Sequence, residues 1–248
     1  MPGARYKIGS IQFSNYTDEE LLHEIENAVL QKKRITLTHP NTHFVVEASR
    51  NREFLNCISR CSYIQADGIG IFAATRFLYP RETIVKSVQT GTDFYFKLMK
   101  YANEMHYAIY FLGSSDEVLD SLIRRVRSEY QGIRIAGSHH GYFDLQESSV
   151  VEEINVSKPE VLLIGMGVPR QEYWLQEHCG NLSVPVCITV GAGLEFISGI
   201  KQRAPKVFRR FGLEWFFRFL QEPGRLWRRY LIGIPQFIII VVKQKFGK

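Results

Sequence analysis

The stretch VLLIGMGVPRQEYWLQEHC, residues 161–179, contains the pattern that decides the fold of this chain. It opens with an unbroken apolar run at 161–164, continues through the loop GMGVPRQE and ends in a helical pattern over 170–179. An unbroken apolar run is typical of a strand that is covered on both faces, as strands of parallel sheets are. The stretch therefore predicts one strand, a loop at the carboxyl end of that strand, and one helix.

The same unit recurs along the first 200 residues. Further apolar runs occur at 35–38, 63–65, 108–112, 133–136 and 186–190, and helical patterns at 18–31, 44–60, 92–105 and 116–130. Strands that alternate with helices favour a parallel sheet with helices on both faces. We therefore predict an α/β fold with a doubly wound, mainly parallel, Rossmann-like sheet.

The amino-acid composition of the chain changes after about residue 199. Residues 201–248 hold 12 Lys or Arg and two acidic residues, a net charge of +10, whereas residues 1–200 carry a net charge of −4. We predict an α/β domain at 1–199 and a basic, aromatic, helical appendage at 200–248. Such a tail suits nucleic acid or an anionic membrane, and its Ile-Ile-Ile-Val-Val run favours the membrane.

The apolar strip at 231–242 is too short to cross a bilayer, because a spanning helix needs about 20 residues. We expect it to dock on a membrane surface, with a buried strand or helix of the core as the alternative. An exposed strip of this kind also favours homo-oligomers in solution. The four cysteines form no CxxC pair and the first residues, MPGARYKIGS, lack a secretory signal, so we expect a reducing cytosol and no metal site.

Ligands of open α/β sheets bind at the carboxyl ends of the strands. Four loops there stand out: THPNTH (38–43), ADGIG (66–70), GMGVPRQE (165–172) and GAG (191–193). Glycines let backbone N–H groups approach a phosphate closely. The segment GIGIFA (68–73) also fits a dinucleotide pattern, which would make the protein an NAD(P)-dependent oxidoreductase, but the following stretch, 83–88, does not end in an acidic residue that holds a ribose.

Asp67 lies between a predicted strand and a glycine turn, and two interpretations remain open from its position. Its carboxylate can cap the following helix, or it can act as a general base toward a hydroxyl within hydrogen-bond reach. Asn41, Gln171 and Glu172 lie in two of the other loops, where their side chains can orient sugar hydroxyls or start a turn or helix. No Asp-x-Asp pair is present, so a carboxylate-held divalent metal is not indicated.

Several motifs together resemble the WecG/TagA/CpsF glycosyltransferases, glycosyltransferase family 26. They are ADG (66–68), TGTDF (90–94), FLGS (111–114), GMGVPRQEYW (165–174) and RAPKVFRRFGLEWFFRFLQEPGRLWRRY (203–230). The resemblance implies an inverting, metal-independent enzyme without a cofactor, which moves a hexose-type sugar (N-acetylmannosamine-like, uronic acid or glucose-like) from a UDP-sugar to an undecaprenyl-diphosphate-linked sugar. It also implies a peripheral enzyme at the cytoplasmic face of the bacterial cell membrane that builds surface polysaccharide or teichoic acid.

The resemblance also assigns roles to residues. The family's proposed catalytic base corresponds to Asp67, its loop asparagine to Asn41 and the glutamine of its GxPxQE motif to Gln171. Its appendage arginines, which are thought to meet the lipid diphosphate, correspond best to Arg225, Arg228 and Arg229. The predicted substrate-binding residues are His39, Gly68, Lys86, Gly165, Gly167, Glu172, Gly191, Gly193 and Glu195.

Three positions depart from the family pattern. His39 replaces the usual threonine, and Glu195 replaces an aspartate. Val88 replaces an arginine, which leaves Lys86 or an arginine of the appendage as the phosphate partner. The departures bear on the identity of the donor more than on the reaction class. A rival of another class is a non-catalytic module at the membrane surface that holds a nucleotide-sugar or a polyprenyl lipid for a partner.

Overall fold

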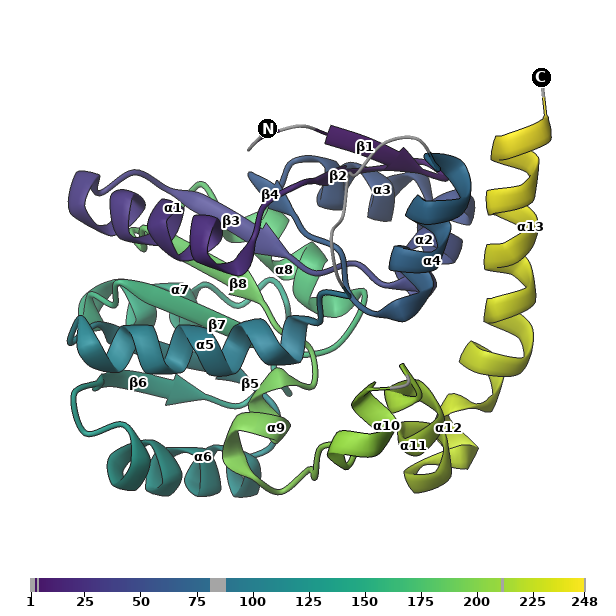
Figure 1. The fold of residues 1–248 in the computed structure, drawn as a ribbon. Coiled ribbons are helices and arrows are strands. Elements are labelled where there is room, and N and C mark those ends of the chain that lie inside the picture. Colours follow the sequence, from purple (N-terminus) through teal and green to yellow (C-terminus); the bar gives the residue numbers. More distant parts are fainter. Residues whose placement is uncertain (1–2, 4, 81–87, 211, 248) are drawn as a thin grey trace.

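Six parallel strands form the central sheet of the computed structural model, which describes residues 3, 5–80, 88–210 and 212–247 (Figure 1). Their order is β4-β3-β8-β7-β5-β6. Their bounds are β3 Ile35–Thr38, β4 Tyr63–Ile64, β5 Ala108–Gly113, β6 Arg134–His139, β7 Val161–Gly165 and β8 Val186–Thr189. Every pairing in the sheet is parallel. β4 and β6 form the two edges, and β7 and β8 fill the centre, so the predicted doubly wound α/β fold is confirmed.

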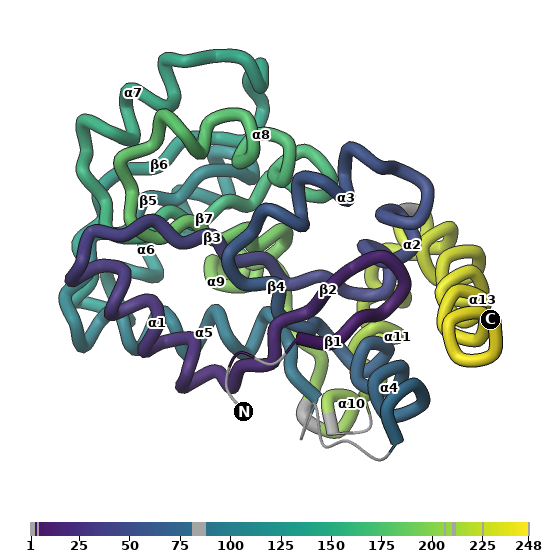
Figure 2. The backbone as a smooth tube through the Cα atoms, turned by 90° about the horizontal axis from the view of Figure 1, so that it is seen from above, coloured from purple at the N-terminus to yellow at the C-terminus, as the bar shows by residue number. Residues whose placement is uncertain are grey.

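Helices cover both faces of this sheet, as Figure 2 shows from above. On one side lie α1 (Asp18–Gln31), α5 (Gly91–Glu104), α6 (Asp116–Glu129) and α9 (Gly193–Ser198), and on the other α7 (Ser148–Ser157) and α8 (Arg170–His178). Strand β5 shows why its apolar run is unbroken. Ile109 and Phe111 enter the first core, whereas Tyr110 and Leu112 enter the second. Burial on both faces removes any polar alternation from such a strand.

A third core lies beyond the β4 edge of the sheet. It is formed by the hairpin of β1 (Arg5–Ile8) and β2 (Ile11–Ser14), with α2 (Thr42–Arg50), α3 (Arg52–Ser59) and α4 (Ile69–Leu78). The helix predicted over 44–60 is wrong as a single element, because Asn51 ends α2 and caps α3. Its Oδ1 accepts the N–H of Phe54 at 2.9 Å, and an asparagine that bonds the backbone in this way starts a new helix.

The appendage is helical, as predicted. It comprises α10 (Lys206–Arg210), α11 (Glu214–Gln221), α12 (Pro223–Trp227), the π-helical turn η1 (Arg228–Ile232) and α13 (Gly233–Phe246). In Figures 1 and 2, α13 stands beside α2 at the edge of the molecule. In the part of the chain that the structure describes, no helix combines the length and the apolar character that a membrane span requires.

The sequence left open whether the apolar strip at 231–242 is exposed for membrane docking or buried in the core. The structure shows that one part of the strip is buried and another part is exposed. Phe237 and Val241 are buried in the third core, whereas Ile238, Ile239 and Val242 are exposed. The same helix is therefore anchored to the body on one side and presents apolar side chains to solvent on the other. The division into domains at residue 199 stays a prediction.

Candidate active site

Asp67 follows the edge strand β4 and is held by donors from two other loops. The backbone N–H of Gly91 donates to its Oδ1 at 2.9 Å, and the side-chain amide of Asn41 donates to its Oδ2 at 3.4 Å. Gly91 is the first residue of α5, so the carboxylate faces the positive end of that helix. The alternative in which Asp67 caps the following helix is wrong. Gly68, whose φ of 87° suits glycine, is the N-cap of α4, and no side chain caps it.

Asn41 has two tasks in the same loop. It is the N-cap of α2, where its Oδ1 accepts the N–H of His43 at 3.0 Å, and its amide nitrogen is the group that contacts Asp67. The helix-starting role that the sequence allowed is confirmed. Because the cap fixes the Asn41 side chain, it also fixes the direction from which Asp67 receives its hydrogen bond.

A polar cavity of about 250 Å³ opens beside Asp67, between the sheet and the appendage. We call it the polar cavity. Eight of the residues predicted from the sequence line it: His39, Asn41, Asp67, Gly167, Gln171, Gly191, Gly193 and Arg229. The four loops at the carboxyl ends of the strands therefore meet in one place.

Gln171 ties two of these loops together. Its Oε1 accepts the N–H of Gly191 at 3.0 Å, and its Nε2 donates to Glu172 Oε1 at 2.7 Å. Glu172 is buried and does not line the polar cavity. Burial raises the pKa of Glu172 to about 7, against the opposing effect of the hydrogen bond from Gln171. The structure therefore places Glu172 behind Gln171, where it supports the glutamine.

His39 lies deep in the polar cavity, where its Nδ1 is 3.3 Å from the hydroxyl of Tyr95. Burial lowers the pKa of His39 to about 4, in spite of the nearby Asp67, so its imidazole is neutral at physiological pH. Its Nε2 has no hydrogen-bond partner among the described residues. The Nε2 of His39 can therefore form one hydrogen bond with a ligand, but the neutral imidazole supplies no positive charge.

Other predicted residues have different surroundings. A Cβ at Gly165 would lie 2.7 Å from Leu194 Cδ1, so this glycine serves close packing at the end of β7. Glu195 pairs at 2.8 Å with Lys201, which itself lines the polar cavity. Lys86 lies outside the described residues.

The appendage contributes arginines to the site, and they are not all the ones that were predicted. Arg229 lines the polar cavity, whereas Arg228 is exposed and stacks on Trp227 at 5.2 Å from the ring centre. The side chain of Arg225 lies outside the described part of the structure. Arg218, which was not singled out, lines the polar cavity and donates to Thr92 Oγ1 at 3.1 Å. Its Nε, like that of Arg209, has no hydrogen-bond partner among the described residues.

Charged contacts hold the appendage against α5. Asp93 of the TGTDF motif accepts from Arg203 at 2.7 Å and lies 3.8 Å from Arg209. Burial alone would raise the pKa of Asp93, but hydrogen bonds from Arg203 and Thr90 hold it below its ordinary value. Asp93 and Arg203 therefore form an ion pair that fastens the start of the appendage beside the site.

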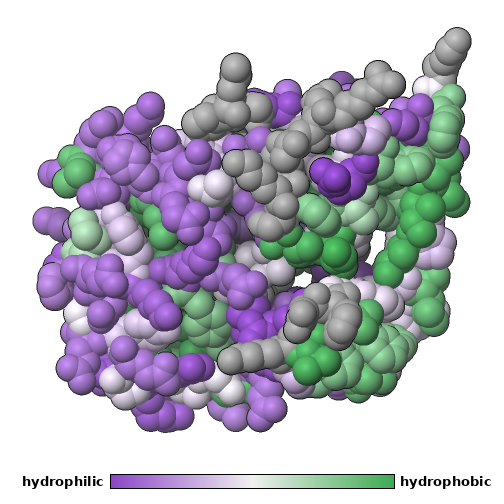
Figure 3. All heavy atoms as spheres, in the orientation of Figure 1, coloured by the Kyte–Doolittle hydropathy of each residue, from purple (hydrophilic) through white to green (hydrophobic). Residues whose placement is uncertain are grey.

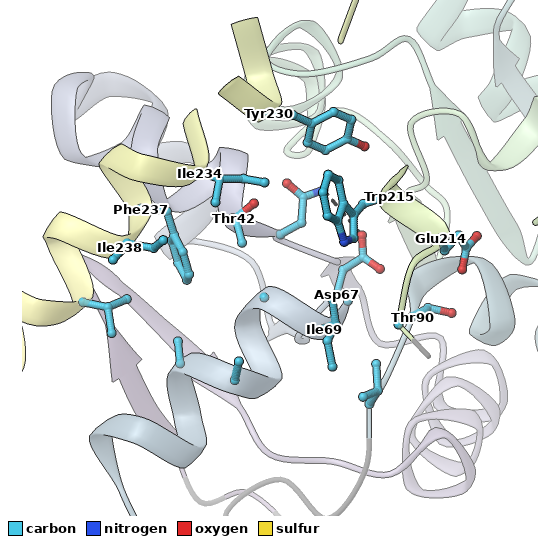
Figure 4. A pocket seen from close by; sticks show the side chains of 18 of the residues that line it. Thr42, Asp67, Ile69, Thr90, Glu214, Trp215, Tyr230, Ile234, Phe237 and Ile238 are labelled. Atoms are coloured by element: carbon cyan, nitrogen blue, oxygen red, sulfur yellow. Dashed lines mark hydrogen bonds between the residues drawn. The ribbon is translucent and has the colours of Figure 1, made fainter. Parts of the chain in front are cut away.

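A second, larger cavity of about 520 Å³ begins at the same carboxylate and runs between α4 and α13 (Figure 4). We call it the apolar groove. Figure 4 shows Tyr230, Ile234, Phe237 and Ile238 of the appendage on one side of it, and Asp67 and Ile69 of the body on the other. Five residues line both cavities: Asn41, Asp67, Arg218, Arg229 and Tyr230. A polar and an apolar cavity thus meet at Asp67.

The model of the family described as "Glycosyl transferase WecG/TagA/CpsF family" matches residues 6–248. The chain belongs to this glycosyltransferase family. Among its curated relatives are proteins of Staphylococcus aureus strains MW2 and MRSA252, each named N-acetylglucosaminyldiphosphoundecaprenol N-acetyl-beta-D-mannosaminyltransferase. Each is 31% identical over 247 residues, which cover 99% of this chain and 96% of the relative.

Membership of the WecG/TagA/CpsF family makes the chain an enzyme that transfers sugars, so neither the oxidoreductase nor the non-catalytic module is supported.

The glycines of the GIGIFA segment in this glycosyltransferase are explained by backbone packing, without a bound dinucleotide. A Cβ at Gly70 would collide with Thr42, and the N–H of Gly68 donates to Gln89 O at 2.7 Å. Within the described ranges, no three His, Cys, Asp or Glu side chains come together as a metal site.

Proposed function

We propose that this glycosyltransferase moves a hexose-type sugar, with N-acetylmannosamine the first candidate, from a UDP-sugar to an undecaprenyl-diphosphate-linked sugar, with inversion and without a metal. One observation carries the proposal. A polar cavity suited to a nucleotide-sugar and an apolar groove suited to a lipid meet at Asp67. The names of the relatives supply the candidate sugar and the candidate acceptor.

The donor is proposed to occupy the polar cavity. Gly167 and Gly191 line it with φ values of 80° and 53°, conformations that leave the backbone open to close approach by a ligand. Arg218 and Arg229 bring guanidinium groups to the lining, which suits a diphosphate in an enzyme that uses no metal. Lys201 also belongs to the lining, where it pairs with Glu195 and Glu222. His39 and the loop held by Gln171 are then left to contact the sugar.

The acceptor hydroxyl is proposed to lie at Asp67, where the two cavities join. Asp67 removes the proton from this hydroxyl as the oxygen attacks the anomeric carbon from the face opposite the leaving UDP. The oxygen–carbon bond forms as the bond to UDP breaks, so a single displacement inverts the anomeric centre. The Gly91 N–H and the Asn41 amide hold the carboxylate in place for this step.

The diphosphate of the acceptor is proposed to lie against Arg209, Arg218 and Arg229, which line the groove beside Asp67. Guanidinium groups form two parallel hydrogen bonds with a phosphate and stay charged at any physiological pH. Because all three belong to the appendage, the site is complete only when the appendage lies against α5. The contact between Asp93 and Arg203 favours that position.

The appendage is also proposed to dock the enzyme on the cytoplasmic face of the cell membrane. Figure 3 shows hydrophobic residues gathered over α13 and the shorter helices beneath it. Exposed members of this surface are Trp215, Phe216, Leu220, Trp227, Leu231, Ile239 and Phe246. Apolar contact combined with about 1 kcal/mol for each basic residue near an anionic surface gives reversible docking without a spanning helix. Off the membrane, we propose that the same surface drives self-association.

UDP release by the purified full-length protein tests the proposal. The donors are UDP-hexoses, UDP-N-acetylhexosamines and UDP-uronic acids, and the acceptor is N-acetylglucosaminyl-diphosphoundecaprenol in anionic vesicles, with and without EDTA. Release that needs one donor and the acceptor, and that persists in EDTA, is expected. Failure of every donor would contradict the proposed substrates, and loss of release in EDTA would contradict a reaction without a metal.

A further inference from the structure

The apolar groove has walls from two elements that are far apart in the sequence. Ala73 and Phe77 of α4 line one side, and Ile234, Ile238 and Val242 of α13 line the other. In Figure 3 a hollow separates α13 from the body, with hydrophobic residues on both sides of it. At about 520 Å³ its size is within the range of pockets that hold organic ligands.

Charge is distributed unevenly along this groove. The charged residues that line it are Asp67, Arg209, Glu214, Arg218 and Arg229, and they belong to the part next to the polar cavity and the start of the appendage. Away from Asp67, the lining that the structure describes between α4 and α13 consists of Ala, Ile, Phe and Val side chains. A ligand that matches this lining has a polar head, with a hydroxyl at Asp67 and its anionic group at the arginines, and a hydrocarbon tail beyond that head.

We infer that the groove between α4 and α13 binds the isoprene units of the acceptor that lie nearest its diphosphate. This inference rests on the proposed function, since it takes the acceptor hydroxyl to lie at Asp67 and the diphosphate to lie at the arginines. The next part of such a molecule is its hydrocarbon chain, and the next part of the cavity is apolar. The lining from Ile234 to Val242 spans about 12 Å along the helix axis, so the groove accepts only the start of a long chain.

Helix α13 has two apolar faces, one that lines the groove and one that points outward and can contact the membrane. Ile238 and Ile239 are neighbours and are each 52% exposed, but Ile238 lines the groove and Ile239 does not. Membrane docking needs only an outward face, which Ile239 supplies. Recognition of the chain inside the protein depends on Ile238 and on Ala73 opposite it. The two neighbours therefore form a matched pair for an experiment.

The test compares two acceptors that are soluble without a membrane, the farnesyl and the methyl esters of N-acetylglucosaminyl diphosphate. The ratio of their kcat/KM values is measured for the wild-type enzyme, for Ile238→Trp and Ala73→Phe, which narrow the groove from opposite walls, and for Ile239→Trp. We expect wild type and Ile239→Trp to prefer the farnesyl ester by at least about 10-fold, given the free energy of burying several methylene groups. We expect both groove variants to reduce that preference toward one.

Transfer to both esters with no preference in the wild type would overturn the inference and leave the proposed function intact. A preference that persists in both groove variants, or that Ile239→Trp removes equally, would also overturn it, because the chain would then bind elsewhere. Transfer to neither ester, nor to the vesicle-borne lipid acceptor, would show that the proposed function itself is wrong. Ala73→Phe and Ile238→Trp alter different helices, so a folding defect in one leaves the other as the test.

Discussion

The side-chain amide of Asn41 lies 3.4 Å from Asp67 Oδ2, while the Oδ1 of the same asparagine caps α2 by accepting the N–H of His43. A serine can keep the cap but has no amide to reach Asp67. We predict that Asn41→Ser lowers kcat with little change in melting temperature, whereas Asn41→Ala also lowers the free energy of unfolding by about 1 kcal/mol. Steady-state kinetics and thermal denaturation check this.

A double-mutant cycle gives the control for that prediction. If Asn41 acts through Asp67, Asn41→Ser costs little further activity once Asp67 is replaced by Asn, because residues in contact are not additive. Equal, additive losses in both backgrounds would show that Asn41 acts on the substrate by another route.

The guanidinium group of Arg218 lines both cavities, whereas Arg228 stacks on Trp227 away from them. We predict that Arg218→Lys raises the KM for the lipid acceptor at least about 10-fold, because a lysine keeps the charge but loses the two-pronged contact with phosphate. Arg228→Lys is the matched control and is expected to change this KM less than about twofold. Equal effects of the two substitutions would contradict the placing of the diphosphate.

The ion pair of Asp93 with Arg203 is predicted to hold the appendage in place. Asp93→Asn should speed hydrogen exchange in α10 and α11 at neutral pH, with little change in the α/β body. The folded state lowers the pKa of Asp93 below 3.8, so the carboxylate stabilises the docked appendage above that pH and ceases to do so as the pH falls through the lowered value. Exchange in the wild type should therefore approach that of the variant only in acid. Unchanged exchange in Asp93→Asn would show that other contacts suffice.

Glu172 is predicted to make the stability of the protein depend on pH. Its pKa rises from 4.5 to about 7 in the folded state, which favours the protonated form. The native protein therefore loses stability relative to the unfolded chain as the pH rises from 4.5 through 7. Glu172→Gln imitates the protonated acid and should be as stable as the wild type at pH 5 but more stable at pH 8, by on the order of 3 kcal/mol. Chemical denaturation at the two pH values checks the sign, and a stability difference that does not change with pH would contradict it.

Much of the fold followed from the sequence, because strands buried on both faces leave unbroken apolar runs. The hairpin of β1 and β2 was missed, since each strand has only four residues and the pattern is too short to separate from chance. The break at Asn51 was missed because the helical periodicity continues across it. Caps depend on backbone angles that composition does not reveal.

The loop residues of the candidate site were predictable from the sequence, but their contacts with distant parts of the chain were not. The rule that ligands bind at the ends of parallel strands brought Asp67, Asn41 and Gln171 together. It did not indicate that Gly91 would hold Asp67, because that contact joins loops distant in the sequence. The arginines of the cavity were predicted only in part: Arg229 lines it as predicted, whereas Arg228 is exposed and Arg218 was not singled out. Pro223 begins a new helix, and the π-helical turn at Arg228–Ile232 changes the phase of the residues that follow.

The substitution Asp67→Asn isolates the proposed role of Asp67 as the base, because asparagine retains an oxygen that can accept the Gly91 N–H but cannot take a proton. Transfer of the donor sugar to the vesicle-borne lipid acceptor is measured for wild type and variant, together with UDP affinity and melting temperature. If Asp67 is the base, turnover falls at least roughly hundredfold while UDP binding and folding are retained. Turnover within a few-fold of the wild type would contradict Asp67 as the base and, with it, the assignment of the reaction to the place where the two cavities meet.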